Sequence, residues 1–143
     1  MKYRYLFLLV LLVAVVSLSA IFDDYEPSAR ARGMGGAFYS QSDDANGIFY
    51  NPAGLNMAST NLMIGYSKLF SNDFQILNTV ALTIELPRKF GIIGIGLQSM
   101  DVDFHDVNLL SEKIYALAHS FRLMQDIHSE INLGYTFNMY HLS

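Results

Sequence analysis

The sequence contains no cysteine and no tryptophan, and only 15% of its 143 residues are charged. Without cysteine, the chain cannot form disulfide scaffolds, thiolate metal sites or thiol nucleophiles. The formal net charge of −4 argues against a protein whose main partner is the phosphate backbone, so we expect no nucleic-acid partner. The length allows at most one ordinary domain. Hydrophobic residues, at 52%, are plentiful by contrast.

The N-terminus is the most hydrophobic part of the chain. Lys2 and Arg4 precede an uninterrupted apolar run over 6–16, and small residues follow up to Ala20. A membrane-spanning helix needs about 20 apolar residues, more than this run supplies. A positive region, an apolar region and a small-residue cleavage region define a secretory signal peptide, so we predict one over 1–20 and expect the protein to be exported. A retained membrane anchor is the alternative, because Leu18 is larger than the residue expected at that place.

The remaining chain divides into two parts of different character. Residues 21–60 are rich in Gly, Ala, Ser, Asn and Asp and show neither a helical nor a strand period. From Asn61 onward apolar and polar residues alternate, which predicts antiparallel strands. Five strands are expected, over 62–70, 76–86, 90–100, 114–123 and 130–139, with short turns at 87–89 and 124–127 and a longer acidic loop over 101–111.

Strands with one apolar and one polar face suit two architectures. In a transmembrane β-barrel the apolar face contacts lipid, whereas in a soluble β-sandwich it forms the core. The polar faces here are mostly small and uncharged, unlike a water-facing surface, and aromatic residues recur near the predicted strand ends. We therefore predict an all-β fold, an antiparallel transmembrane β-barrel. A soluble exported β-sandwich with a binding or structural role is the alternative.

Three sequence blocks precede the predicted strands. They are the glycine-rich stretch 29–38 (ARARGMGGAF), the patch 43–46 (DDAN) and the segment 51–55 (NPAGL). In this order and spacing they resemble the N-terminal region of the FadL/PorV-like outer-membrane transport proteins. The resemblance is strong over residues 27–60 and weaker for the strand layout through residue 142.

The resemblance implies that residues 21–60 form an N-terminal plug, or hatch, inside the barrel lumen, and that 61–143 supply the first strands of the barrel. The chemistry of the segment agrees with this: glycines permit positive φ and tight turns, Asn before Pro favours extended backbone, and Asp and Asn side chains satisfy backbone donors. The residues assigned to the plug motif are Gly33, Gly35, Gly36, Asp43, Asp44, Asn46, Asn51, Pro52, Ala53 and Gly54.

By the same resemblance, the protein belongs in the bacterial outer membrane, with lipid as a partner. It acts either as a channel that passes hydrophobic small molecules beyond the plug or as a platform for secretion-system proteins. The three blocks look closer to the PorV-like version, so fatty-acid uptake is not the main expectation.

No catalytic constellation is predicted. Asp101, Asp103 and Asp106 lack the spacing and closing Glu of a calcium-binding EF-hand. The four histidines lie on separate segments, and no Ser/His/Asp or paired-carboxylate arrangement can be identified. We therefore expect no enzyme, no metal and no cofactor.

The length conflicts with a complete barrel. Single-chain barrels begin at roughly eight strands of about 9–11 residues, and only five strands are expected here. An open sheet would leave unpaired backbone groups facing lipid, which is costly. The sequence therefore predicts the N-terminal fragment of a longer barrel protein.

Overall fold

The computed structural model describes residues 26–69, 74–87, 90–105 and 107–143. The predicted signal peptide over 1–20 lies outside the described residues, as does the start of the predicted plug, 21–25. Within the described residues, no helix has the length and apolar character needed to cross a membrane.

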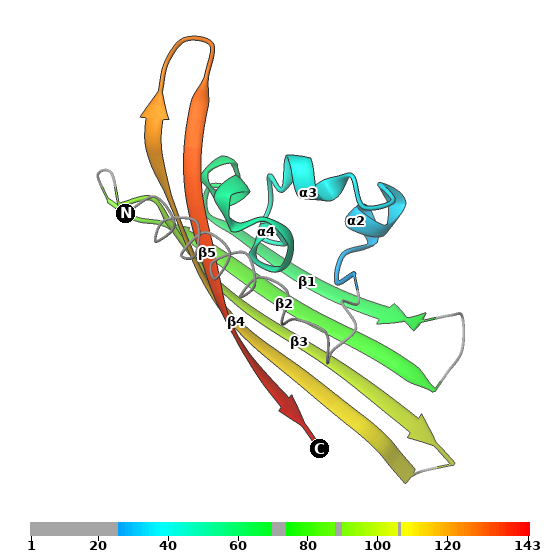
Figure 1. Ribbon diagram of the computed structural model, residues 1–143. Helices are drawn as coiled ribbons and strands as arrows, with labels where there is room; N and C mark the ends of the chain where they lie inside the picture. The colour runs from blue at the N-terminus through cyan, green and yellow to red at the C-terminus, as the bar shows by residue number, and fades with distance from the viewer. Residues whose placement is uncertain (1–25, 70–73, 88–89, 106) are drawn as a thin grey trace, which may run out of the picture.

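Five antiparallel strands form one sheet, and their spatial order is their order in the sequence (Figure 1). The prediction of an all-β fold with five antiparallel strands is therefore confirmed. Among the residues that the structure describes, the sheet is open, with β1 and β5 at its edges, and is not closed into a barrel. The strands are β1 (Asn61–Lys68), β2 (Gln75–Glu85), β3 (Ile92–Phe104), β4 (Val107–Gln125) and β5 (Glu130–Leu142).

Short helices precede the sheet and cover one of its faces (Figure 1). We call residues 26–58 the helical segment, the face that it covers the inner face, and the opposite face the outer face. The sequence of this segment, rich in glycine, alanine and asparagine, shows no helical period. Each helix is only one or two turns long, which is too short for such a period to appear. The helices are α2 (Ala29–Gly33), α3 (Phe38–Gln41), α4 (Gly47–Tyr50) and the 3₁₀ helix η1 (Pro52–Met57).

Strand alternation gives the two faces of the sheet opposite compositions, because successive side chains point to opposite sides. Along β2, Thr79, Ala81 and Thr83 are buried on the inner face, whereas Val80 and Ile84 are 40% and 46% exposed on the outer face. Large apolar residues occur on the inner face mainly toward its ends, at Leu77, Ile92, Met100 and Ile114. Its central part in β2 to β5 is built from small or polar residues: Thr79, Ala81, Thr83, Gly94, Gly96, Gln98, Ala116, Ala118, Ser120, Gly134, Thr136 and Asn138.

The main core lies between the helical segment and the inner face. Ile48 and Leu55 of the helical segment pack with Ala81, Ala116 and Ala118 of the sheet, and all five side chains are nearly inaccessible. Small sheet residues allow the helices to approach closely, so this core depends on short distances more than on large side chains. A second, smaller cluster consists of Leu69, Leu77 and Met100, at the end of the sheet where β1 connects to β2 and β3 to β4.

The predicted acidic loop over 101–111 is wrong, because β3 and β4 both extend into it and the turn between them is tight, with His105 at φ 48°. The longer connection that was expected between the third and fourth strands is therefore replaced by a short one. The physical reason is that the charge of Asp101 has hydrogen-bond partners within the sheet. The Asp101 carboxylate accepts hydrogen bonds from the hydroxyls of Ser99 (3.0 Å) and Ser111 (2.7 Å), so it is compatible with a paired strand.

The turn between β4 and β5 also differs from the prediction. β4 continues to Gln125, so the turn lies at 126–129 instead of 124–127, and the Asp126 amide donates to the Ser129 carbonyl at 2.7 Å. Pairing between β3 and β4 ends at Ile92 and Ser120, whereas β4 and β5 remain paired beyond it. The β4–β5 hairpin therefore projects past the rest of the sheet (Figure 1).

Candidate functional site

Three glycines on the inner face create the space in which the helical segment sits. A Cβ atom on Gly94 would lie 2.6 Å from the Ile48 side chain, and one on Gly96 would lie 2.6 Å from the Phe49 ring. A Cβ on Gly134 of β5 would lie 2.7 Å from the Pro52 carbonyl oxygen. Real Cβ atoms do not approach other atoms this closely, so the helical segment fits the sheet only because these positions lack a side chain.

Hydrogen bonds from the sheet fix the same part of the helical segment. The Asn56 amide donates to the Ser120 hydroxyl at 2.7 Å, and Ser120 in turn donates to the Ala53 carbonyl at 3.3 Å. The Thr136 hydroxyl of β5 donates to the Ile48 carbonyl at 3.1 Å. Carbonyls near helix ends need partners outside the helix, and the inner face supplies them here. Residues 47–57 are thus anchored to β3, β4 and β5 by packing and by hydrogen bonds.

The predicted Asn-Pro-Ala-Gly motif forms the start of η1. Asn51 has extended backbone (φ −145°), and its side-chain oxygen accepts a hydrogen bond from the Ala53 amide at 3.2 Å. Pro52 occupies the first helical turn, where no backbone donor is needed. A Cβ on Gly54 would lie 2.7 Å from the Ser42 carbonyl oxygen. The predicted extended conformation of Asn51 is confirmed, and the motif acts as a helix cap that packs tightly against Ser42.

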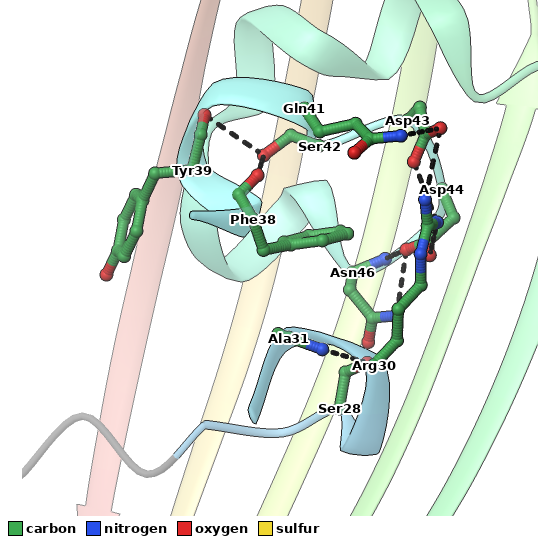
Figure 2. Close-up of polar contacts among 10 residues, drawn as sticks. All are labelled: Ser28, Arg30, Ala31, Phe38, Tyr39, Gln41, Ser42, Asp43, Asp44 and Asn46. Atoms are coloured by element: carbon green, nitrogen blue, oxygen red, sulfur yellow. Dashed lines mark hydrogen bonds and ion pairs between the residues drawn. The ribbon is translucent and has the colours of Figure 1, made fainter. Parts of the chain in front are cut away.

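The acidic patch forms an ion-paired cluster with Arg30 of α2, and Figure 2 shows that the two sets of side chains face one another. The Arg30 guanidinium lies 2.7 Å from an Asp43 carboxylate oxygen and 2.8 Å from one of Asp44. The Gln41 amide also donates to Asp43, at 3.1 Å. The hydrogen bond from Arg30 lowers the pKa of the Asp43 carboxyl below its ordinary value, although desolvation opposes this shift. The cluster connects α2 with the turn before α4.

Asp44 and Asn46 have the local role that was expected. The Asp44 carboxylate accepts hydrogen bonds from the backbone and side-chain amides of Asn46, both at 2.8 Å. This is an Asx turn, in which a side chain replaces a backbone partner. Sequence reasoning thus found the role of Asp44 but missed the pairing of Asp43 with Arg30, although the basic residues of the 29–38 block were its signal.

The glycine-rich turn joins α2 to α3. Gly35 and Gly36 have φ values of 57° and 86°, in the left-handed region that favours glycine. Gly33 differs from the prediction of positive φ, because it is the last residue of α2 and continues the helix. This turn is open, since a Cβ at any of the three positions would meet no atom within 4 Å. The predicted plug residues therefore fall into three groups: Asn51 to Gly54 in the part packed on the sheet, Asp43, Asp44 and Asn46 in the cluster with Arg30, and the three glycines at an open turn.

The outer face carries uncovered apolar residues in continuous rows. Leu62 is 62% exposed, Leu117 is 54% exposed and Phe137 is 70% exposed. His119 lies among these residues, and its ring nitrogens contact the Tyr135 hydroxyl at 3.1 Å and the Phe90 carbonyl at 2.8 Å. Cross-strand neighbours form two rows over all five strands: Leu62, Leu82, Ile95, Leu117 and Phe137, and beside it Ile64, Val80, Leu97, Tyr115 and Met139.

Polar residues border these rows toward one end of the strands. Asn78, Ser99, Lys113 and His141 are successive cross-strand neighbours on β2 to β5. The outer face is thus an apolar band with a polar margin. No group of three His, Asp or Glu side chains that could hold a metal ion occurs in the part of the chain that the structure describes.

The sheet residues that receive the helical segment were not identified from the sequence. Taken alone, each of these residues is typical of any strand with one apolar and one polar face. They are Gly94, Gly96, Ser120, Gly134 and Thr136. Their signal is collective, because all five fall on the same face once the strands are aligned.

Comparison with known proteins identifies no relative: no family model, no curated protein and no solved structure matches this chain. The FadL/PorV-like resemblance stays a prediction that depends on the three N-terminal blocks.

Proposed function

We propose that this chain forms part of the wall of an outer-membrane β-barrel of the FadL/PorV-like kind, with its outer face in contact with lipid. The observation that carries the proposal is the exposed apolar band of five antiparallel strands. Large continuous apolar patches on a protein mark surfaces that meet a partner or a membrane. In this proposal the missing partner is lipid hydrocarbon.

The placement of polar groups supports lipid over water on the outer face. Buried or lipid-facing polar atoms need partners within the protein, and His119 has contacts at both ring nitrogens. Lys113 lies in the polar margin instead of the band. A membrane strand needs roughly 9–11 residues, and β2 to β5 contain 11, 13, 19 and 13 residues.

The position of the helical segment supports a plug on the lumen side of that wall. It covers the small and polar inner face, and residues 47–57 are held there by Ser120, Thr136 and the three inner-face glycines. A lumen wall of this kind must accommodate the segment without large side chains. We propose that this plug controls either the passage of hydrophobic small molecules or the attachment of secretion-system proteins.

Lipid-quenching measurements test the proposal, and the absence of cysteine makes them straightforward. Single cysteines replace Ile95 and Leu117 of the outer face and, as the matched control, Ala116, which neighbours Leu117 in sequence but is buried on the inner face. Each variant carries a fluorophore and is studied in its native membrane fraction and in vesicles containing brominated lipid. We expect strong quenching at positions 95 and 117 and weak quenching at 116.

Two results would contradict a membrane wall. Recovery of the protein in the soluble exported fraction, with equal and weak quenching at all three positions, would favour the exported β-sandwich. Equal strong quenching at 116 and 117 would reject the assignment of the inner face to the lumen.

A further inference from the structure

A small cavity lies between the helical segment and the inner face, where β3, β4 and β5 pass beneath α3 and α4. Its volume is about 120 Å³, several times the ~10–15 Å³ that one water molecule requires. It can therefore accept a ligand of several non-hydrogen atoms. The side chains of interest in its lining are Glu26, Tyr39, Phe49, Tyr50, Asn138 and Tyr140.

The lining combines several aromatic rings with a carboxylate. The rings of Tyr39 and Tyr50 lie 5.1 Å apart with their planes at 79°, so they form two walls of different orientation. The Tyr50 hydroxyl oxygen is buried without a hydrogen-bond partner. Burial raises the pKa of the Tyr50 hydroxyl, and the charge of Glu26 raises it further, so this group stays neutral near the Glu26 carboxylate.

This chemistry favours one class of ligand. Aromatic ring faces attract cations, and cages of aromatic residues recognise quaternary ammonium groups. A nearby carboxylate adds charge complementarity that a neutral ligand would not use. We propose that the cavity binds a small organic cation, such as a quaternary ammonium group, between the rings of Tyr39, Tyr50 and Tyr140, with Glu26 as its counter-charge.

The positive charge of Arg32 allows a second test, because its removal should have the opposite effect on cation affinity from the removal of Glu26. Its charge acts on Tyr50 in the sense opposite to that of Glu26, and its buried Nε atom has no hydrogen-bond partner. Arg32 does not line the cavity, but a positive charge that acts on Tyr50 should oppose the binding of a cation beside that ring. Removing each charge should change the affinity in opposite directions.

The experiment compares two ligands of the same shape. Purified full-length protein is titrated calorimetrically with choline and with 3,3-dimethylbutan-1-ol, in which carbon replaces the charged nitrogen. We expect the dissociation constant of choline to be at least about tenfold lower than that of the alcohol. A tenfold ratio is what a modest contribution from cation–π contacts and from the carboxylate would produce. Equal affinities, or no binding of either compound, would overturn the proposal.

Variants identify the site. Glu26→Gln should weaken choline binding about tenfold, whereas Glu85→Gln, which removes a carboxylate elsewhere on the sheet, should leave it unchanged. Tyr140→Leu should weaken it, and Tyr115→Leu, on the outer face, should not. Arg32→Gln should strengthen it. Circular dichroism shows which variants remain folded, and a folded Glu26→Gln protein with unaltered choline affinity would reject the site.

Binding of a cation in this cavity does not depend on what covers the outer face. Failure of choline binding would leave the lipid-quenching result unaffected, and a soluble protein that binds choline at this cavity would reject the membrane wall alone.

Discussion

The two faces of the sheet come from the same five strands but follow opposite rules of composition. The outer face has large apolar side chains that no other part of the described structure covers, such as Phe137 at 70% exposure. The inner face has mainly glycine, alanine, serine and threonine in its central part, with larger apolar residues such as Ile92 nearer its ends, and it is the face that is covered. In a water-soluble protein the large apolar side would normally be the buried one. The reversal teaches that the covered face is selected for close approach, and that the uncovered face is suited to an apolar surrounding.

The largest effect is expected from a charge placed in the centre of the outer apolar band. If the outer face meets lipid as we propose, Leu117→Arg should destabilise the protein in vesicles by about 2–4 kcal/mol, the cost of a cation near the middle of the lipid face of a barrel. Urea titration in lipid vesicles, followed by far-UV circular dichroism, measures this. His128→Arg, in the 126–129 turn, is the control and should change stability by less than about 0.5 kcal/mol. An effect at Leu117 no larger than that of the control would show that water covers the outer face.

A somewhat smaller effect is expected from filling the inner face. Gly134→Val should destabilise the protein by about 1–3 kcal/mol, because the new side chain must displace the backbone at Pro52. Gly33→Ala is the control: its Cβ meets no neighbouring atom and the residue is helical, so a gain of up to about 1 kcal/mol is expected. Tolerance of valine at 134 would mean that the Pro52 segment does not rest on β5 in solution.

The hydrogen bonds between sheet and helical segment should contribute less. Ser120→Ala removes the acceptor of the Asn56 amide and the donor to the Ala53 carbonyl, and we expect a loss of about 1 kcal/mol. A double-mutant cycle with Asn56→Ala measures the coupling, which should be about 0.5–1.5 kcal/mol. Strictly additive effects of the two substitutions would show that this contact does not form.

The smallest effect concerns the exposed cluster at Arg30. Since pairing lowers the pKa of Asp43, its contribution is complete above the ordinary value of 3.8 and is lost as the pH falls through the lowered value. The protection factor of the α2 amides, which corrects for the pH dependence of intrinsic exchange, should therefore fall below about pH 3.8 relative to that of η1. Asp43→Asn should show a lower protection factor of α2 at neutral pH and a smaller further decrease in acid. Equal acid responses of the variant and the parent protein would exclude Asp43 as the responsible group.

Sequence reasoning identified the sheet because alternation is a local property of the chain. The segment around Leu133 alternates regularly and that around Val80 does so with Asn78 as an exception, and both are strands in the structure. It failed at Asp101, because the hydroxyls that satisfy this carboxylate come partly from Ser111 on the next strand. A pattern read along one strand cannot contain that partner.

The helical segment was harder to predict, because its structure depends on the surface beneath it. Helices of four to six residues are too short to show a period or to be stable alone. The Asn51 cap could be anticipated from its neighbour Pro52. The contact between Pro52 and Gly134, by contrast, joins residues far apart in the sequence. A glycine at position 134 shows that a side chain is absent there, but not which distant segment packs against it.

The odd number of strands has a geometric consequence for closure. In an antiparallel up-and-down sheet of five strands, β1 and β5 run in the same direction. If the two edges are to join through antiparallel neighbours only, the polypeptide placed between them must contribute an odd number of strands, which makes the total even, as in bacterial single-chain barrels. Direct pairing of β5 with β1 of an identically oriented neighbouring molecule would instead create a parallel seam. The direction of the edges therefore decides which added strands could close this sheet through antiparallel pairs and which could not.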